Sequence, residues 1–157
     1  MNRPPQCETI RVGVEHLGAV MTIMDEAFSP QFGEAWTASQ CEGMLVLPGS
    51  WLLLAIVDQK PAGFALIRSA VGEAELLLIA TLPVFQRRKI GEALINRVID
   101  DCRNAEIRAL HIEVRADNPA LAFYTRVGFK QVGIRKNYYH GALGGQSDAI
   151  TSTLLLY

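Results

Sequence analysis

Residues 82–92 place the strongest limit on the fold of this chain. They read Leu-Pro-Val-Phe-Gln-Arg-Arg-Lys-Ile-Gly-Glu and overlap the end of the apolar run Glu75–Leu82. From Ile90 the apolar residues take up the 3.6-residue spacing of a helix, so a strand leads through three consecutive cations directly into a helix. The first turn of a helix offers free backbone N–H groups and the positive end of its dipole. The junction therefore predicts a site for phosphate or pyrophosphate, and the alternative is a solvated basic turn. Because it matches neither a GxxxxGK(S/T) nor a GxGxxG loop, ATP hydrolysis and a Rossmann-type cofactor are disfavoured.

The hydrophobic pattern on both sides of this junction predicts one mixed α/β domain over residues 1–157. Thr37 and Gln40 form a capping box for a helix, Asn118 caps another, and Gly128 ends that helix. The result is an α/β fold with a mixed central sheet of about seven strands and four helices on its faces. The expected strands are Thr9–Val14, Trp51–Val57, Gly63–Ser69, Glu75–Leu82, Ala109–Val114, Phe129–Ile134 and Ala149–Leu156, with a loop at Asn137–Ser147 and helices along Leu17–Phe28, after Thr37, from Ile90 and from Pro119.

Composition limits the function classes. The chain has 157 residues, 50% of them hydrophobic, and a formal net charge of −1, so it can bury a core but is not drawn as a whole to nucleic acid or anionic lipid. Cys7, Cys41 and Cys102 form no metal-binding or redox motif, so we expect reduced thiols and no metal site. Met1–Glu8 lacks the apolar run of a signal peptide, and no apolar run reaches the ~20 residues of a membrane helix. We expect a soluble, cytoplasmic protein.

The strand expected at residues 109–114 carries a second informative pattern. On a strand that includes Arg115, the side chains of His111, Glu113 and Arg115 share one face, and the other face is apolar. A central strand of an α/β sheet is normally apolar on both faces, so three polar groups predict a wet cleft or a sheet edge. For Glu113 the alternatives are a catalytic carboxylate and one paired with Arg115 or another cation. Tyr124, on the next helix, is by itself typical of a core residue with its hydroxyl at the rim.

Together these motifs resemble the GNAT superfamily of acetyl-CoA-dependent N-acetyltransferases. The resemblance runs from about residue 74 to the C-terminus and rests on Gln86–Gly91, Glu113–Arg115, Asn118, Tyr124 and Gly128-Phe129. Within the superfamily the chain is similar to the RimI family, which acetylates the N-terminal alanine of a ribosomal protein. That likeness rests on Glu113–Ala116, Tyr124 with Val127–Phe129, Ile134–Tyr139 and Asp148–Ile150.

The resemblance implies where acetyl-CoA binds. The pantetheine arm would lie along the backbone of Ile79, Ala80 and Thr81, and Asn118 would lie near the cofactor. The residues that would cradle the pyrophosphate are Arg87, Arg88, Lys89, Ile90, Gly91 and Glu92. Two positions depart from the family pattern: Lys89 stands where glycine is usual, and the segment from Asn118 to Tyr124 is one residue shorter.

The resemblance also implies a mechanism of direct transfer in a ternary complex, with Glu113 as proton acceptor and Tyr124 as proton donor. An N-terminal α-amine has a pKa of ~7.7–8.0, so much of it must lose a proton before it attacks the thioester. No covalent acyl-enzyme forms, so the cysteines have no role.

For the acceptor, the expected partner is a protein or peptide N-terminus, such as that of a ribosomal protein. Phe32, Trp36, Tyr138 and Tyr139 fall in loops that frame the acceptor cleft in relatives, where they either bind the peptide or pack in the core. The alternatives are a GNAT enzyme that acetylates a small amine or a lysine side chain, and a non-catalytic acetyl-CoA-binding module. Retention of Glu113 and Tyr124 argues against the last of these.

Overall fold

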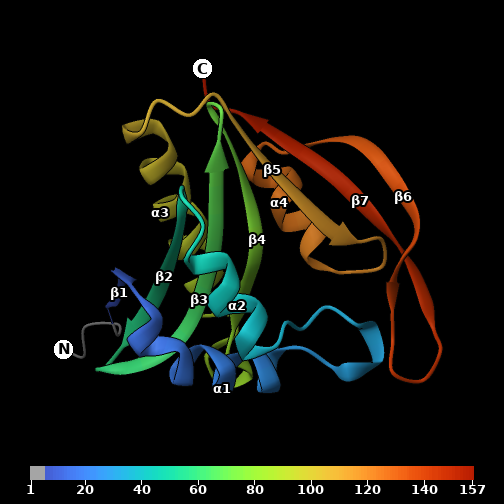
Figure 1. The fold of residues 1–157 in the computed structure, drawn as a ribbon, viewed down its shortest axis with the longest axis horizontal. Coiled ribbons are helices and arrows are strands. Elements are labelled where there is room, and N and C mark those ends of the chain that lie inside the picture. The colour runs from blue at the N-terminus through green and yellow to red at the C-terminus, as the bar shows by residue number, and fades with distance from the viewer. Residues whose placement is uncertain (1–5) are drawn as a thin grey trace.

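The computed structural model describes residues 6–157; Met1–Pro5, part of the segment that argued against a signal peptide, lies outside the described residues. The described chain forms one seven-stranded sheet in the order β1-β2-β3-β4-β5-β7-β6, in which only β4 and β5 pair in parallel (Figure 1). The expected mixed sheet with four α-helices is confirmed. The strands are β1 Cys7–Val12, β2 Ser50–Val57, β3 Lys60–Ala70, β4 Glu73–Thr81, β5 Ala109–Arg115, β6 Lys130–His140 and β7 Gln146–Leu155, and the helices are α1 Leu17–Ala27, α2 Ala38–Leu45, α3 Ile90–Asn104 and α4 Ala120–Val127.

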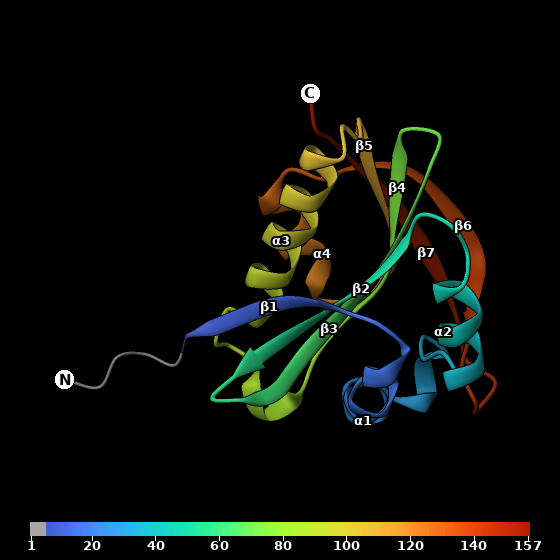
Figure 2. The same cartoon turned by 60° about the vertical axis from the view of Figure 1, so that its left-hand side comes forward.

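The helices form a layer on each side of the sheet, with α3 and α4 on one side and α1 and α2 on the other (Figure 2). Each layer buries its own apolar cluster against alternate residues of the strands. Leu94 and Val98 of α3 pack with Leu53 and Leu110, whereas Val20 and Met24 of α1 pack in a second cluster that includes Leu52, Leu54 and Phe64. Apolar residues on both faces of β2 and β3 explain why both strands are buried along most of their length.

A β-bulge in β4 creates the opening that matters most for function. Leu66 and Ile67 of β3 face Leu78 and Leu76 of β4, so Leu77 is an extra residue on β4. The parallel pairing of β4 with β5 spans only four positions and ends at the pair Leu76–Ile112. Beyond that pair the two strands diverge, and the backbone of β4 is left free on the side of β5.

Local signals in the sequence located several helix ends, whereas most predicted strand ends differ from the observed ones by one or more residues. The Thr37–Gln40 capping box forms in full at the start of α2. The Asn118 side chain accepts a hydrogen bond from the Ala120 N–H at 2.9 Å, although α4 itself begins one residue later than expected, and Gly128 ends α4 with φ +120°. The first strand lies two residues earlier than predicted, at β1.

The loop expected at Asn137–Ser147 was wrong. β6 continues to His140 and β7 begins at Gln146, so only residues 141–145 connect them. The reason is a register shift between Arg135 and Tyr139, where Asn137 adopts φ +52° and donates its N–H to Asp148 Oδ1 at 2.8 Å. The bulge keeps the two strands paired through a polar stretch that sequence pattern alone favours as a loop.

Within residues 6–157, no helix has both the length and the apolar character needed to cross a membrane.

Candidate active site

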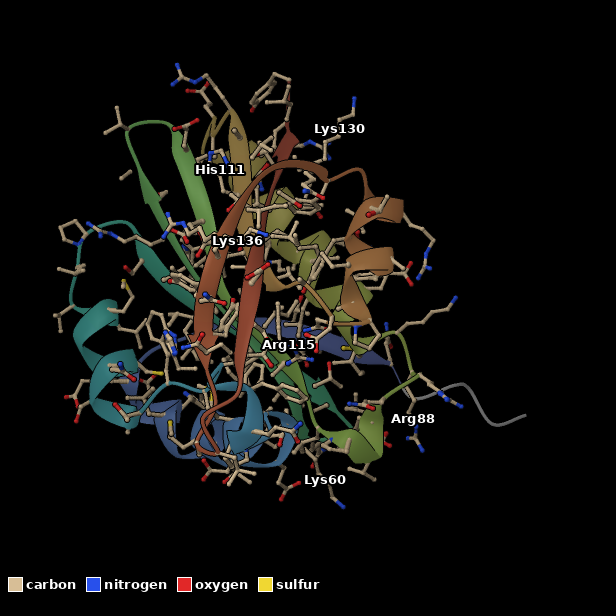
Figure 3. All side chains as sticks on the ribbon, turned by 90° about the vertical axis from the view of Figure 1, so that its right-hand side faces the viewer. Lys60, Arg88, His111, Arg115, Lys130 and Lys136 are labelled. Carbon is tan, nitrogen blue, oxygen red and sulfur yellow. The ribbon has the colours of Figure 1, made fainter. Side chains whose placement is uncertain are left out.

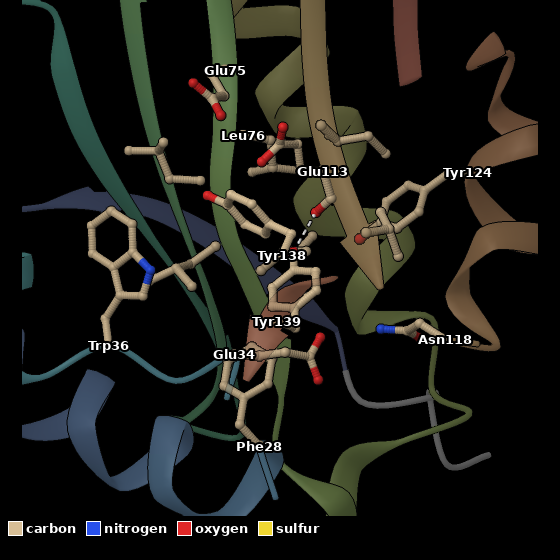
Figure 4. A pocket seen from close by; sticks show the side chains of 15 residues that line it. Phe28, Glu34, Trp36, Glu75, Leu76, Glu113, Asn118, Tyr124, Tyr138 and Tyr139 are labelled. Atoms are coloured by element: carbon tan, nitrogen blue, oxygen red, sulfur yellow. Dashed lines mark hydrogen bonds between the residues drawn. The ribbon is translucent and has the colours of Figure 1, made fainter. Parts of the chain in front are cut away.

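The divergence of β4 and β5 opens a cavity, here called the cleft, that gathers residues from distant parts of the chain (Figure 4). Its walls come from β4, β5, the loop between α1 and α2, the start of α4 and the end of β6. The lining residues are Phe28, Glu34, Trp36, Glu75–Ile79, Ile112–Val114, Asn118, Tyr124, Tyr138 and Tyr139. Among the expected acceptor residues, Trp36, Tyr138 and Tyr139 line this cleft.

Glu113 projects from β5 into the cleft, and its side chain is 14% exposed. Its Oε1 forms an ion pair with Nε of Arg135 at 2.8 Å and accepts a longer hydrogen bond from Oγ1 of Thr151 at 3.4 Å. The Glu113 carbonyl accepts a hydrogen bond from the Tyr139 hydroxyl at 3.3 Å (Figure 4). The carboxylate thus has a cation partner, but the partner is Arg135 of β6 and not Arg115.

Tyr124 reaches the cleft from α4. The residue is 7% exposed, and its ring packs against Phe123 and Phe129 with centroid distances of 5.3 and 5.7 Å. Among residues 6–157, none forms a hydrogen bond with its hydroxyl, which lies in the lining of the cleft. Burial and the nearby charge of Glu34 raise the pKa of Tyr124, so the phenol carries its proton at neutral pH.

Two further acidic side chains surround the cleft. Glu75 lies on β4 at the exposed rim, and desolvation together with the charge of Glu113 raises its pKa. Burial raises the pKa of Glu34, against the opposing effects of Arg115 and Asn118. Sequence reasoning missed Glu34, because it lies in a loop with no local signal.

The three polar side chains of β5, His111, Glu113 and Arg115, each contact a different part of the structure. His111 Nδ1 lies 2.7 Å from Thr153 Oγ1, and its Nε2 lies 3.3 Å from Glu73 Oε1. Arg115 points toward the loop between α1 and α2, where its guanidinium lies 3.6 Å from the ring centroid of Phe32. Phe32 is therefore covered by Arg115 and is not part of the cleft lining.

A second cavity, here called the anion cavity, lies at the N-terminus of α3. Its lining contains Arg87, Lys89, Ile90, Gly91 and Glu92 of the expected pyrophosphate site. Thr81 and Arg126 also line it, and Arg126, from α4, is a cation that sequence reasoning missed. Arg88 is not in this lining; its guanidinium lies 5.7 Å from the ring centroid of Phe85.

The backbone of this loop is held in an unusual shape. Arg87 and Lys89 have φ of +65° and +60°, in the left-handed region that glycine adopts most easily. Lys89 directly precedes α3, so the left-handed conformation lies immediately before the first turn of the helix. A Cβ at Gly91 would meet open space, so the helix start is accessible to a ligand.

The free edge of β4 connects the two cavities. Ile79 lines the cleft, Thr81 lines the anion cavity, and Ala80 between them is buried. Unpaired backbone groups of a strand can bind an extended polar chain through backbone hydrogen bonds.

The three cysteines are free thiols. Burial raises the pKa of Cys7, Cys41 and Cys102, that of Cys102 to about 11, so these thiols are poor nucleophiles.

Comparisons with known proteins agree with this geometry. Residues 17–129 match the model of the acetyltransferase (GNAT) family. A ribosomal protein bS18-alanine N-acetyltransferase of Haemophilus influenzae is 35% identical over 66% of this chain and 71% of that protein. Its counterpart of Salmonella typhimurium is 41% identical over 62% of this chain and 66% of that protein. The crystal structure of the ribosomal-protein-S18-alanine N-acetyltransferase of Escherichia coli matches with a TM-score of 0.87 and 28% identity, over 96% of this chain and 94% of that one.

Proposed function

Because this chain belongs to the GNAT acetyltransferase family, we propose that it acetylates the N-terminal alanine of ribosomal protein bS18, as its named relatives do. Membership of the family implies acetyl-CoA as the acetyl donor. The observation that carries the proposal is that Glu113 and Tyr124, from β5 and α4, line one cleft beside the unpaired edge of β4.

The chain's own residues fit acetyl-CoA at two places. Arg87 and Lys89, the first backbone N–H groups of α3 and Arg126 surround a cavity suited to the pyrophosphate. The backbone of Ile79, Ala80 and Thr81 would hold the pantetheine arm, and Asn118 lines the same cleft. Acetyl-CoA bound there supplies an acetyl group as a thioester.

Glu113 is the proposed proton acceptor. Its carboxylate takes a proton from the substrate ammonium, which leaves the amine lone pair free to attack the thioester carbonyl carbon. Arg135 holds this carboxylate at the wall of the cleft, and Thr151 restrains the same oxygen.

Tyr124 is the proposed proton donor. Its hydroxyl keeps its proton at neutral pH because burial raises its pKa, and it donates that proton to the departing sulfur. As the tetrahedral intermediate collapses, the attacking nitrogen loses its second proton to solvent, and solvent returns a proton to Tyr124. Trp36, Tyr138 and Tyr139 are the proposed aromatic contacts of the acceptor peptide. We propose that the reaction uses no metal ion. Because the proposed substrate is a ribosomal protein, we place the reaction in the cytoplasm. Residues 1–157 would carry it out as one domain.

The test is a thiol-release assay with acetyl-CoA and matched acceptors. We expect turnover with a peptide that carries the N-terminal sequence of bS18, and none with the same peptide blocked at its α-amine. Glu113→Gln keeps the shape but removes the proton acceptor, so turnover should fall by about 10²-fold or more, with partial recovery at higher pH. Turnover with the blocked peptide through a lysine side chain, or only with small amines, would assign the enzyme to another acceptor class.

A further inference from the structure

Arg115 makes a set of contacts that the proposed chemistry does not use. Its side chain is 8% exposed, yet it carries a full charge at the end of β5, two residues from Glu113. It forms ion pairs through Nη1 with Glu34 Oε1 and through Nε with Asp117 Oδ1, and its guanidinium covers the ring of Phe32 at 3.6 Å. In Figure 3, Arg115 is labelled beside the lower half of the β6–β7 hairpin.

Two of these partners belong to one segment, residues 28–37, here called the acceptor loop. Glu34 lies 81 positions from Arg115 in the sequence, so the contact joins distant parts of the chain. The acceptor loop contributes Phe28, Glu34 and Trp36 to the lining of the cleft. The charge and the planar face of one arginine therefore fix the position of a cleft wall.

The β6–β7 hairpin also contacts the acceptor loop. The N–H of Ala142 donates to the carbonyl of Pro30 at 3.1 Å. A Cβ at Gly33 would collide with the carbonyl of His140, and a Cβ at Gly141 would collide with the carbonyl of Gln31. The acceptor loop thus contacts both Arg115 and this hairpin, whose β6 strand also contributes Tyr138 and Tyr139 to the lining of the cleft.

Stability alone does not account for Arg115. Replacing a buried ion pair with apolar residues of similar volume is often neutral or stabilising, because the charges no longer need to be desolvated. Burial raises the pKa of Glu34 despite the neighbouring arginine, which indicates that the fold holds this carboxylate at a cost. The Arg115–Glu34 ion pair requires the burial of two charged groups and lies beside the cleft. A pair of this kind is suited to positioning the wall of the cleft.

We propose that Arg115 is a positioning residue that acts through Glu34 and Phe32 to hold the acceptor loop as the wall of the cleft that receives the substrate peptide. The inference rests on the proposed function. It assigns Arg115 to acceptor binding and leaves acetyl-CoA binding to the anion cavity and the β4 edge.

The experiment compares Arg115→Met, Glu34→Gln and the double variant in steady-state kinetics with the bS18 peptide. Arg115→Met should raise the KM for the peptide by about tenfold or more and change the KM for acetyl-CoA less than about twofold. The double variant should be little worse than either single variant, because both remove the same contact.

Arg97→Met is the matched control. Arg97 is 32% exposed, more than Arg115, and is likewise paired, with Asp101 at 2.9 Å and the carbonyl of Thr9 at 2.7 Å, but none of these residues lines the cleft. This variant should leave the KM for the peptide unchanged, even if it lowers the melting temperature. Equal increases of both KM values in Arg115→Met, or additive effects in the double variant, would overturn the proposal.

Amide hydrogen exchange tests the same proposal without any substrate. Arg115→Met should speed exchange in residues 28–37 while exchange in α3 stays as in the unchanged protein. If the unchanged protein does not acetylate the peptide, the proposed function fails, but the exchange result still decides whether Arg115 holds the loop. Unaltered exchange in residues 28–37 would show that it does not.

Discussion

Tyr124 has two parts that can be tested separately, because its ring packs against Phe123 and Phe129 while its hydroxyl lies in the cleft lining. Tyr124→Phe removes one oxygen and almost no volume, so the melting temperature should change little. A proton donor at this position predicts a fall of about 10²- to 10⁴-fold in kcat. The loss should shrink with an acetyl donor whose leaving thiol is more acidic, because that thiolate departs without help.

The control for this prediction is the thermal unfolding curve of the same variant. Unchanged melting together with unchanged turnover would make the hydroxyl a bystander, and a strong fall in melting temperature would assign it a packing role.

The raised pKa of Glu75 predicts that this residue affects protein stability in a pH-dependent way. Its pKa in the folded protein is raised above the ordinary value of 4.5 by desolvation and by Glu113, with Arg135 and His111 acting in the opposite direction. The fold therefore favours the protonated form, and that contribution is lost as the pH rises through the raised pKa. Glu75→Gln should stabilise the protein at pH 8 and leave it unchanged near pH 4.

Solvent at the rim screens the Glu75 carboxylate, so the gain should stay below about 1 kcal/mol. Chemical denaturation at both pH values measures it, and Glu8→Gln on the far edge strand β1 is the control. A loss of stability at pH 8 would contradict the assigned direction of the pKa shift.

At the scale of elements, the loop that starts α3 combines positive charge with a strained backbone. Lys89 adopts φ +60° immediately before the helix, a conformation that costs a residue with a Cβ about 1–2 kcal/mol. Lys89→Gly should therefore stabilise the protein by about 1 kcal/mol after the entropy of glycine in the unfolded chain is counted. Arg88, which lacks a positive φ, is the matched position, and Arg88→Gly should not stabilise.

Urea unfolding of both variants decides this prediction. Equal stability changes in the two variants would mean that the left-handed conformation of Lys89 carries no strain.

At the scale of the whole molecule, the proposed acetyl-CoA site extends over both cavities and the β4 edge. We therefore expect acetyl-CoA to bind the folded state and not the unfolded chain. A ligand at a hundred times its Kd stabilises the folded state by about 2.7 kcal/mol. The melting temperature should rise with acetyl-CoA concentration, and replacing both Arg87 and Arg88 with alanine should reduce that rise and flatten the salt dependence of binding.

Calorimetric titration gives the same binding constant independently. Acetylated pantetheine, which lacks the pyrophosphate, should give a smaller rise that the double variant does not change. Absence of binding at millimolar acetyl-CoA would remove the functional content of the cofactor assignment.

The elements whose signals are local could be predicted from the amino-acid sequence. The 3.6-residue spacing from Ile90, the Thr37–Gln40 capping box and the apolar meander before residue 82 each act within a few residues, and the structure contains all three. The position of Glu113 on a polar strand face and of Arg87–Gly91 at a helix start followed from the same periodicities.

Which of these residues come into contact depends on the three-dimensional fold. The bulge at Leu77 separates β4 from β5. The ion pair of Arg115 with Glu34 spans 81 positions in the sequence. Glu113 pairs with Arg135 of β6, although Arg115 is nearer in the sequence. The spacing of residues along a strand shows which side chains share a face, but not which loop or neighbouring strand will lie against that face. Those contacts depend on how strands far apart in sequence pair and pack, and that pairing turned Glu34, Arg126 and Arg135 into parts of the site.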